Sequence, residues 1–344
     1  MATTLVIRLS SFGDVAILIP VLYSVAEKNP GDKFLLITKS NFQSLFLNKP
    51  SNLEIYPVYT KDQHKGIKGL WKLIQELNKK GIDKIADLHN VLRSKEIDWY
   101  FKLKGKKVAL IDKGKSEKKE LVRKNNKKLR PLTPSIERYQ KVFEKLGYDA
   151  SLTFDSLIKP TEEDTSSIKH LSNEKRKFLI GIAPFAKHTG KIYPLNQMEK
   201  VIEGLSSRED TQIFLFGGKD EKEKLRDWEE KYENVQSVAG KLNLEDELLL
   251  ISKLNVMLTM DSANMHLASL VNTPVVSIWG ATHPYAGFYG YKQNPENAVQ
   301  VDLDCRPCSV FGNKPCYRQD YACMKQIEPE RVISKIEKVI GRNS

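Results

Sequence analysis

The sequence predicts an α/β protein made of two Rossmann-like domains, whose parallel sheets face each other across a cleft. Short apolar runs alternate with stretches of helical spacing, and this alternation stops at a polar segment and then starts again. The length of 344 residues suits two domains, since a domain commonly has roughly 100–200 residues. Ligands of open α/β sheets bind beyond the carboxyl ends of the strands, so we expect a site in the cleft.

The first half contains the elements of one parallel sheet. Strands are expected at 4–9, 33–38, 53–58, 84–88 and 107–111. Helices are expected at 15–28, 66–80, 93–103 and 135–146. A polar, loop-like stretch follows. We therefore expect a first domain over 1–150 and a linker over 151–176.

The second half repeats the alternation. Strands are expected at 178–183, 212–216, 235–238, 256–260 and 274–279. Helices are expected at 196–205, 220–232, 244–252, 262–271 and 329–340. A second domain is therefore expected over 177–325, and 326–344 is expected to form a C-terminal helix that packs back on the first domain.

The positive charge is concentrated in one segment. The net charge is +12, and residues 102–130 hold 13 Lys or Arg against three acidic residues. Such a segment suits nucleic acid, a phosphorylated ligand or an anionic membrane surface, or it is a solvated loop. Nucleic-acid binding is disfavoured because the segment contains no aromatic residue on which a base would stack. No signal peptide or membrane-spanning run is recognised, so the cytoplasm is the expected compartment.

Two predicted strands are followed by carboxylates. Asp14 stands at a helix entrance, where it either accepts a proton from an attacking hydroxyl or caps the helix. Asp261 and Ser262 precede another helix, whose free N–H groups suit a phosphate. Asp261 would repel phosphate and is therefore assigned to sugar hydroxyls, with His266 in reach of the same ligand. An ordinary helix cap with a buried histidine fits this second segment as well.

The loops after two other strands of the second half offer a cationic and a glycine-rich segment. The first contains Thr189 and Lys191, and a lysine there would compensate a diphosphate leaving group where no metal is used. The second contains Gly217 and Gly218, which let a nucleotide approach the backbone or simply form a tight turn. A surface loop is the alternative for the first segment.

All four cysteines lie near the C-terminal end, at Cys305, Cys308, Cys316 and Cys323. Four thiols with one C-x-x-C spacing predict a structural zinc site. The second pair lacks that spacing, so reduced or paired cysteines stay open as alternatives. A catalytic thiol is disfavoured because no histidine lies near them in the sequence.

Six segments together resemble one known family along nearly the whole chain. They read R-x-S-S-x-G-D-V at 8–15, D-x-H-x-x-x-R-S at 87–94, R-Y and L-G within 138–147, K-x-Y-P at 191–194, D-S-A-x-M-H-L-A at 261–268 and W-G-A-T at 279–282. Their order and spacing resemble those of glycosyltransferase family 9, the ADP-heptose:lipopolysaccharide heptosyltransferases. The closing C-x-P-C is also similar to many members of that family.

The resemblance implies a GT-B fold and an inverting glycosyl transfer that needs no metal cofactor, from ADP-heptose to a lipopolysaccharide core or lipid A-type acceptor. The implied catalytic residues are Asp14, as general base, and Lys191, as the group that holds the leaving diphosphate. The implied donor-binding residues are Thr189, Gly217, Gly218, Asp261, Ser262, Ala263 and His266, with Asp220 or Glu221 at the ribose. The assigned acceptor-binding residues are Ser11, Gly13, Arg93, Lys124 and Arg130.

Two features depart from the family pattern. Ala263 stands where the family has glycine, and the basic segment 102–130 is not a family motif. Under the resemblance, that segment would hold a phosphorylated, lipid-linked acceptor or meet the anionic inner leaflet of the membrane. The alternatives are a sugar-nucleotide epimerase of the same architecture and a family member that uses another nucleotide sugar.

Overall fold

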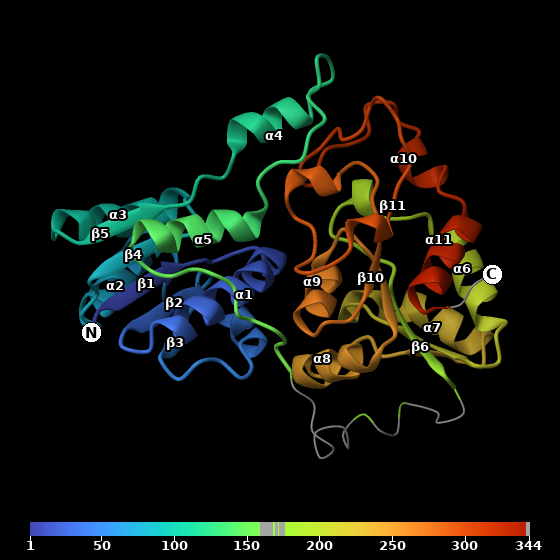
Figure 1. Ribbon diagram of the computed structural model, residues 1–344, viewed down its shortest axis with the longest axis horizontal. Coiled ribbons are helices and arrows are strands. Elements are labelled where there is room, and N and C mark those ends of the chain that lie inside the picture. The colour runs from blue at the N-terminus through green and yellow to red at the C-terminus, as the bar shows by residue number, and fades with distance from the viewer. Residues whose placement is uncertain (159–167, 169–170, 172–175, 342–344) are drawn as a thin grey trace. The chain divides into compact units, whose positions relative to one another are not determined.

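The computed structural model describes residues 1–158, 168, 171 and 176–341. The chain divides into two compact units, the first formed by 1–113 with 133–155 and the second by 114–132 with 156–344. Within the described residues, no helix has the length and apolar character needed to cross a membrane. Figure 1 shows the elements of both units along the chain.

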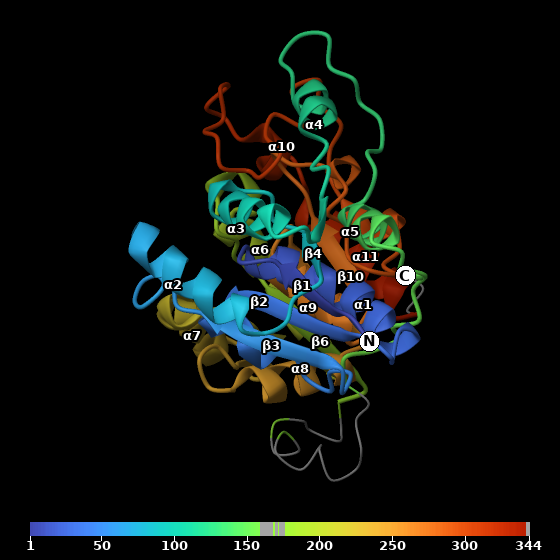
Figure 2. The same cartoon turned by 90° about the vertical axis from the view of Figure 1, so that its left-hand side faces the viewer.

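The first unit has a five-stranded parallel sheet in the order β3-β2-β1-β4-β5. Its strands are β1 (Thr3–Ile7), β2 (Lys33–Lys39), β3 (Leu53–Val58), β4 (Lys84–Asp87) and β5 (Lys107–Leu110). One face is covered by α1 (Phe12–Lys28) and α5 (Ser135–Lys145), the other by α2 (Gly66–Asn78) and α3 (Leu92–Leu103), as Figure 2 shows. The central strand β1 is apolar over Leu5–Ile7 because helices bury both of its faces.

The second unit has a six-stranded parallel sheet in the order β11-β10-β9-β6-β7-β8. Its strands are β6 (Phe178–Ala183), β7 (Thr211–Leu215), β8 (Val235–Ser237), β9 (Val256–Met260), β10 (Val275–Ile278) and β11 (Ala298–Val299). The helices on one face are α6 (Leu195–Ser206), α7 (Lys222–Lys231) and α11 (Pro329–Val339). Those on the other face are α8 (Leu244–Lys253) and α9 (Ala263–Leu270).

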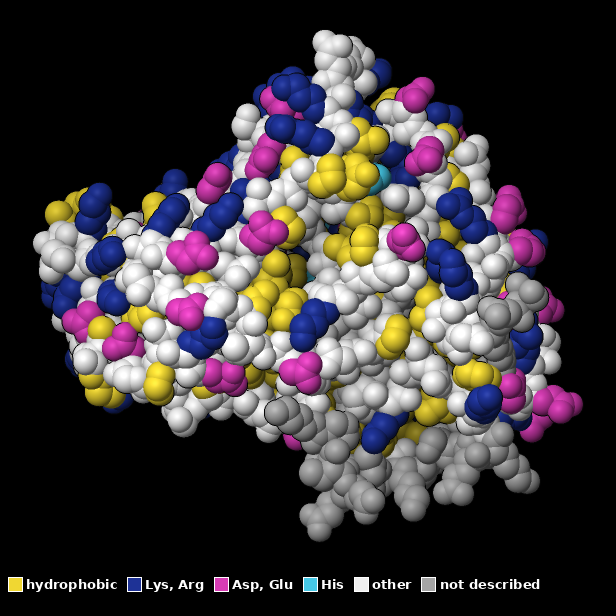
Figure 3. Space-filling view, viewed as in Figure 1, with side chains coloured by type: hydrophobic (Ala, Val, Ile, Leu, Met, Phe, Trp, Pro, Cys, Tyr) yellow, Lys and Arg dark blue, Asp and Glu magenta, His cyan; other side chains and the backbone are white. Residues whose placement is uncertain are grey.

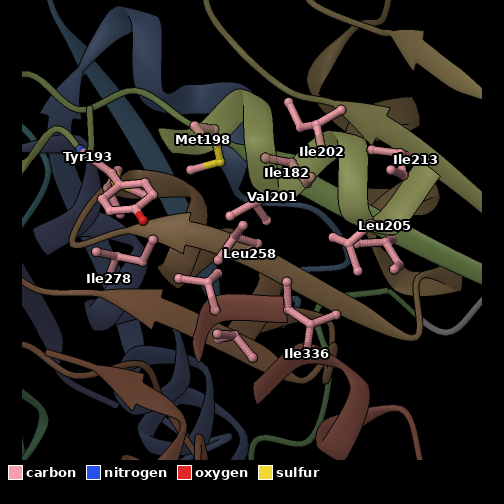
Figure 4. Packing of buried hydrophobic residues seen from close by; sticks show 14 of the residues in the cluster. Ile182, Tyr193, Met198, Val201, Ile202, Leu205, Ile213, Leu258, Ile278 and Ile336 are labelled. Carbon is pink, nitrogen blue, oxygen red and sulfur yellow. The ribbon is translucent and has the colours of Figure 1, made fainter. Parts of the chain in front are cut away.

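The C-terminal helix belongs to the core of the second unit. We expected it to pack on the first domain, but α11 packs along α6 and against the sheet. Ile336 lies among the same buried side chains as Leu205 and Leu258 (Figure 4). The close approach of the two helices requires a small residue, since a Cβ at Gly204 would lie 2.6 Å from Cδ1 of Ile333. The helix thus closes one face of its own sheet.

The predicted strands and helices have counterparts, and three differences concern the site. Helix α1 begins at Phe12, so Asp14 lies within its first turn rather than before it. A short helix that we did not expect, α4 (Lys115–Leu121), lies in the basic segment. Residues 114–132 belong to the second unit, although we placed them in the first domain. The expected linker 151–176 falls largely outside the described residues.

Burial of one face of α11 predicts a large loss of stability when its core side chain is shortened. Ile336→Ala should lower the free energy of unfolding by about 2–5 kcal/mol, because it leaves a cavity between α11 and α6. Ser334→Ala, on the exposed side of the same helix, is the matched control and should change it by less than about 0.5 kcal/mol. Urea unfolding measures both. Equal, small effects would contradict the placement of α11 in the core.

Candidate functional site

In the first unit, the loops after β1 and β4 lie at the same edge of the sheet because these parallel strands are neighbours. The first loop leads to Ser11, Gly13 and Asp14, and the second leads to Arg93 at the start of α3. Ser10 Oγ lies 3.3 Å from Nε2 of His89, which joins the two loops directly. The structure therefore brings four of the predicted acceptor and catalytic residues to one edge.

Asp14 is held by three donors, all of which reach its Oδ2 atom. The backbone N–H of Ser11 donates over 3.0 Å, its hydroxyl over 2.7 Å, and Nη2 of Arg8 lies 2.6 Å away. Burial would raise the pKa of Asp14, but the charge of Arg8 and the Ser11 hydrogen bonds outweigh it, so the pKa is lowered. Asp14 is therefore an ionised carboxylate at neutral pH, and it serves as a helix cap as well.

Arg8 was not selected as a site residue from the sequence, although Arg8 is the first residue of the motif at 8–15. Its Nη1 donates to the Leu88 carbonyl over 2.5 Å, and its guanidinium lies 5.7 Å from the centre of the Tyr139 ring. Arg8 is buried, so its charge acts on Asp14 with little screening by water. The strand-end position of Arg8 was the signal that could have identified it.

One buried carboxylate, Asp87, supports the loop that carries Arg93, and a second buried carboxyl group, Asp98, lies close to it. Asp87 accepts the backbone N–H groups of His89 and Asn90 and the hydroxyl of Ser94, over 2.7–2.8 Å. Burial, reinforced by the charge of Asp87, raises the pKa of Asp98 well above its usual range. Asp98 is therefore protonated at neutral pH.

Arg93 reaches across the same edge to the loop that follows β3. Its Nη1 donates to the backbone carbonyl of His64 over 2.8 Å. The His64 ring is itself buried, and its Nε2 lies 2.9 Å from Oε2 of Glu76. The Arg93 guanidinium is thus fixed at the edge rather than extended into solvent.

In the second unit, strands β9, β6 and β7 are neighbours, and their following loops hold the predicted donor residues. The loop after β6 contains a short 3₁₀ turn, Thr189–Lys191. The segments after β9 and β7 contain the remaining residues, which are Asp261, Ser262, Ala263, His266, Gly217, Gly218, Asp220 and Glu221. All of these residues therefore lie at the carboxyl edge of one sheet.

Lys191 and Asp261 form a largely buried ion pair at this edge. The Lys191 Nζ atom lies 2.8 Å from Oδ2 of Asp261, and the two side chains are 16% and 6% exposed. No hydrogen bond of ordinary geometry reaches that oxygen from the described residues, so the lysine charge is its main compensation. The aliphatic part of the Lys191 side chain packs on Gly312, since a Cβ at Gly312 would lie 2.6 Å from Cγ of Lys191.

The start of α9 is not capped by its own serine. Ser262 occupies the N-cap position, but its hydroxyl lies 3.0 Å from Oγ1 of Thr259 and does not bond the helix N–H groups. His266 is buried in the second turn. The first-turn N–H groups therefore remain the feature at this end that suits an anion.

The loop after β7 distinguishes between the two predicted ribose carboxylates. Glu221 Oε2 accepts the backbone N–H of Gly218 over 2.7 Å, and a Cβ at Gly217 would lie 2.9 Å from that oxygen. The Glu221 carboxylate is therefore used for a hydrogen bond within the turn. Asp220 is exposed at the same edge, which leaves it as the carboxylate able to turn toward a ligand.

Thr189 also lines a pocket of about 240 Å³ in the second unit. The pocket is bounded by two loops, and its lining includes two lysines; the residues are Lys187, His188, Thr189, Gly312, Asn313, Lys314, Pro315 and Tyr321. Both lysines are exposed, so the pocket is positively charged. It opens beside the backbone of the 3₁₀ turn that carries Lys191.

The four cysteines are unpaired. Burial raises the pKa of Cys323 to about 11, although Arg306 opposes this, so that thiol is neutral. Across the described ranges, no three His, Cys, Asp or Glu side chains come together as a metal site. The predicted zinc site at Cys305, Cys308, Cys316 and Cys323 therefore stays a prediction that this arrangement does not support.

Lys124 and Arg130 lie in the second unit, whereas Ser11 and Arg93 lie in the first. Two buried leucines, one in the basic segment and one just after it, explain this, since they pack against residues of the second unit; the cluster contains Leu121, Leu132, Ala286 and Phe288. Lys124 lies over the Tyr317 ring at 5.1 Å, and Arg130 lies 3.9 Å from Glu120.

Comparison with known proteins gives one consistent family. Residues 70–316 match the model described as glycosyltransferase family 9 (heptosyltransferase). The lipooligosaccharide heptosyltransferase 2 of Campylobacter jejuni is 24% identical over 95% of this chain and 96% of its own. The lipopolysaccharide core heptosyltransferase OpsX of Haemophilus influenzae is 24% identical over 97% and 96%.

Solved structures confirm the predicted GT-B fold. The glycosyl transferase family 9 protein of Veillonella parvula is similar with a TM-score of 0.76, at 20% identity, over 98% of this chain and 97% of its own. The ADP-heptose lps heptosyltransferase II of E. coli is similar with a TM-score of 0.71, at 18% identity, over 99% and 98%.

The protonated state of Asp98 predicts a specific dependence of stability on pH. The folded protein keeps a proton that the unfolded chain loses above the usual Asp pKa, so this group lowers stability as pH rises through neutrality. Asp98→Asn stays neutral and removes that loss. Urea unfolding at about pH 5 and about pH 9 should show the variant gaining stability over the parent at the higher pH. The same change at exposed Asp149 should give no such gain, and an equal response of both variants would refute the assignment.

Proposed function

The chain belongs to glycosyltransferase family 9, and we propose that it transfers a heptose from ADP-heptose to a lipopolysaccharide-type acceptor with inversion at the anomeric carbon. Membership makes the chain a glycosyltransferase. The sugar and acceptor class are supported by the names of the relatives, which are heptosyltransferases of lipooligosaccharide or lipopolysaccharide. The single observation that carries the proposal is the Lys191–Asp261 ion pair at the carboxyl edge of the second sheet.

The second unit is the proposed donor site. A departing diphosphate develops negative charge, and a fixed cation stabilises that charge without reorganisation. Lys191 is assigned this role because Asp261 and Gly312 hold its side chain in place. Asp261, whose Oδ2 has no ordinary hydrogen bond within the described ranges, is assigned to accept hydroxyls of the heptose.

The remaining donor contacts follow from their place at the same edge. Thr189 is proposed to contact a phosphate, and Asp220, which Glu221 leaves as the available carboxylate, is proposed to contact the ribose. The backbone near Gly217 and Gly218 gives the nucleotide a close approach. Ser262, Ala263 and His266 are proposed to line the part of the site that binds the heptose.

The first unit is the proposed acceptor site. Asp14 accepts the proton of the acceptor hydroxyl while that oxygen bonds to the anomeric carbon. The bond from this carbon to the diphosphate oxygen breaks, and ADP leaves with its electron pair. Ser11, Gly13 and Arg93, which lie at the same edge as Asp14, are proposed to position the acceptor.

The proposed chemistry assigns charge compensation to Lys191 rather than to a metal cofactor. The acceptor is proposed to be a phosphorylated saccharide linked to lipid, which the protein meets as a peripheral protein at the inner membrane. Lys124 and Arg130, which belong to the second unit, stay proposed acceptor-binding residues.

A panel of nucleotide sugars tests the proposal. The purified enzyme is given ADP-heptose, ADP-glucose, UDP-glucose and UDP-N-acetylglucosamine, each with a heptose-deficient lipopolysaccharide core, and products are identified by mass spectrometry. We expect transfer from ADP-heptose above all others, with the α-configured product expected from inversion of a β-linked donor. An epimerised nucleotide sugar without transfer, or preference for another donor, would overturn the assignment.

Replacement of the proposed base should abolish turnover without loss of donor binding. Asp14→Asn keeps one oxygen that can accept from Ser11 and Arg8 but cannot take the proton, so kcat should fall by about 10²–10⁴-fold. Because Arg8 lowers the pKa of Asp14, the parent enzyme should keep full kcat/KM down through the usual Asp range and lose it only below. Asp149→Asn is the control, and ADP affinity measured by calorimetry should be unchanged in both. Retained turnover would remove Asp14 from the role.

Loss of the lysine charge should weaken ADP and slow transfer together. Lys191→Met keeps the stem that packs on Gly312 but removes the charge, so kcat should fall by about 10²–10³-fold. ADP affinity should fall as well, as calorimetry would show. Lys200→Met, an exposed lysine of α6, is the matched control. Unchanged kinetics in a folded Lys191→Met variant would exclude the diphosphate role.

A further inference from the structure

Helices α2 and α3 of the first unit present large apolar side chains to solvent. Five residues each expose more than half of their surface, and we call them the α2–α3 face: Ile67, Trp71, Leu92, Trp99 and Leu103. Single exposed apolar residues are ordinary, but a group of this size on two adjacent helices marks an interaction site.

The exposed apolar residues follow the helical repeat. On α3, Leu92, Trp99 and Leu103 are spaced by seven and four residues, which places them in one stripe. The opposite side of α3 is buried and contains two polar residues, the full set being Ser94, Ile97, Asp98 and Phe101. Apolar residues therefore lie on both sides of the helix, and the core accounts for only those on one side.

The two helices form one continuous surface. They pack side by side, and the Trp71 and Tyr100 rings meet edge to face with their centres 5.7 Å apart. Ile67 and Trp71 are four residues apart, so they lie on the same side of α2. Figure 2 shows α2 and α3 on the same face of the first sheet. Figure 3 shows hydrophobic side chains interspersed with Lys and Arg on the face of the molecule that Figure 1 views.

The charges around the α2–α3 face are mostly positive. Exposed lysines lie on or next to the two helices, at Lys65, Lys68, Lys72, Lys95 and Lys102. Glu96 is the exposed acid of α3, whereas Glu76 of α2 accepts the Tyr56 hydroxyl and contacts His64. The surface thus combines apolar side chains, two of them tryptophans, with a cationic surround, and its complement is an anionic surface with an apolar interior.

The α2–α3 face begins at the edge that we assign to the acceptor. Helix α3 starts directly after β4, so Leu92 is the chain neighbour of Arg93. Helix α2 follows β3, and His64, just before it, is the residue whose carbonyl accepts from Arg93. Both helices therefore begin at the edge that contains Asp14 and run back along the sheet.

We propose that the α2–α3 face docks on the surface of an anionic lipid bilayer, the one that carries the lipid-linked acceptor. Tryptophans and lysines are the side chains that favour the membrane interface, the former at its apolar boundary and the latter near anionic head groups. The inference rests on the proposed function for the identity of the acceptor, but the docking surface stands on exposure and charge alone.

The basic segment is the weaker candidate for this role. Lys127 donates to the carbonyls of Asp304 and Arg306, and Lys128 lies 3.2 Å from Glu120. Its cations are thus partly used within the second unit.

Intrinsic fluorescence tests the docking directly. The chain has four tryptophans, of which Trp71 and Trp99 are exposed on this face while Trp228 and Trp279 are buried. Vesicles of phosphatidylglycerol mixed with phosphatidylcholine should shift the emission to shorter wavelength, and brominated acyl chains should quench it. Phosphatidylcholine vesicles alone, or high salt, should give a much smaller change.

Matched variants locate the surface. Trp71→Ser with Trp99→Ser should lower vesicle co-sedimentation at least about tenfold, and Lys68→Glu with Lys72→Glu should lower it for anionic vesicles. Phe311→Ser with Tyr317→Ser removes two comparably exposed aromatic residues of the second unit and should leave binding unchanged. Lys124→Glu with Lys128→Glu should also leave it unchanged. Circular dichroism confirms that each variant is folded.

Several results would overturn the proposal. They are no shift and no co-sedimentation of the parent, retained binding in the double tryptophan variant, or loss of binding in the Lys124 and Lys128 variant. A parent dimer in sedimentation velocity that the tryptophan changes dissociate, without vesicle binding, would identify a second copy as the occupant. Transfer to a deacylated, water-soluble acceptor should be unchanged in the tryptophan variant, so failure of the docking and failure of the proposed function are distinguishable.

Discussion

In each unit a carboxylate pairs with one neighbouring cation, and the proposed chemistry depends on these two ion pairs. Replacing a buried ion pair by apolar side chains is often neutral or stabilising, so Lys191 with Asp261 has little value as packing alone. The pairs differ in one respect that matters. Asp14 Oδ2 is held by three donors, whereas Asp261 Oδ2 depends on Lys191. The first pair therefore fixes the proposed base in position, whereas the ion pair with Lys191 is the main polar contact of Asp261 Oδ2 among the described residues.

The parallel sheets bring distant segments of the chain together at each edge. Ser10 and His89 are distant in the chain, but they are in contact because β1 and β4 are hydrogen-bonded neighbours whose ends coincide. In the same way β6 and β9 bring Lys191 to Asp261. Because every strand runs in the same direction, each strand-to-helix loop adds its residues to the same edge. The helices outside the sheet then need only to be amphipathic, which is how α11 satisfies the second unit.

Much of this site could be predicted from the sequence, because strand ends and helix starts are local features. Asp14, Lys191 and Asp261 were identified by their place after apolar runs. The partner of Asp14 was not, since a strand-end arginine can turn in several directions and only the folded loop points Arg8 at Asp14. The excess of positive charge likewise predicts that the basic segment lies on the surface, but it does not predict which unit the segment packs against. Its position is set by Leu121 and Leu132, whose partners are more than 150 residues away.

The α2–α3 face is the feature that neither packing nor catalysis explains. Catalytic groups of a parallel α/β unit lie at the carboxyl edge, and the core needs only the inner side of each covering helix. The outer side of α3 serves neither requirement. Polar residues are therefore expected there, because large apolar side chains are costly to expose. Trp99 and Leu103 are not, although the exposed acid and lysines beside them show that polar residues fit the helix. Their exposure therefore implies an occupant, and an acceptor held in a bilayer supplies one at the edge where its hydroxyl would have to meet Asp14.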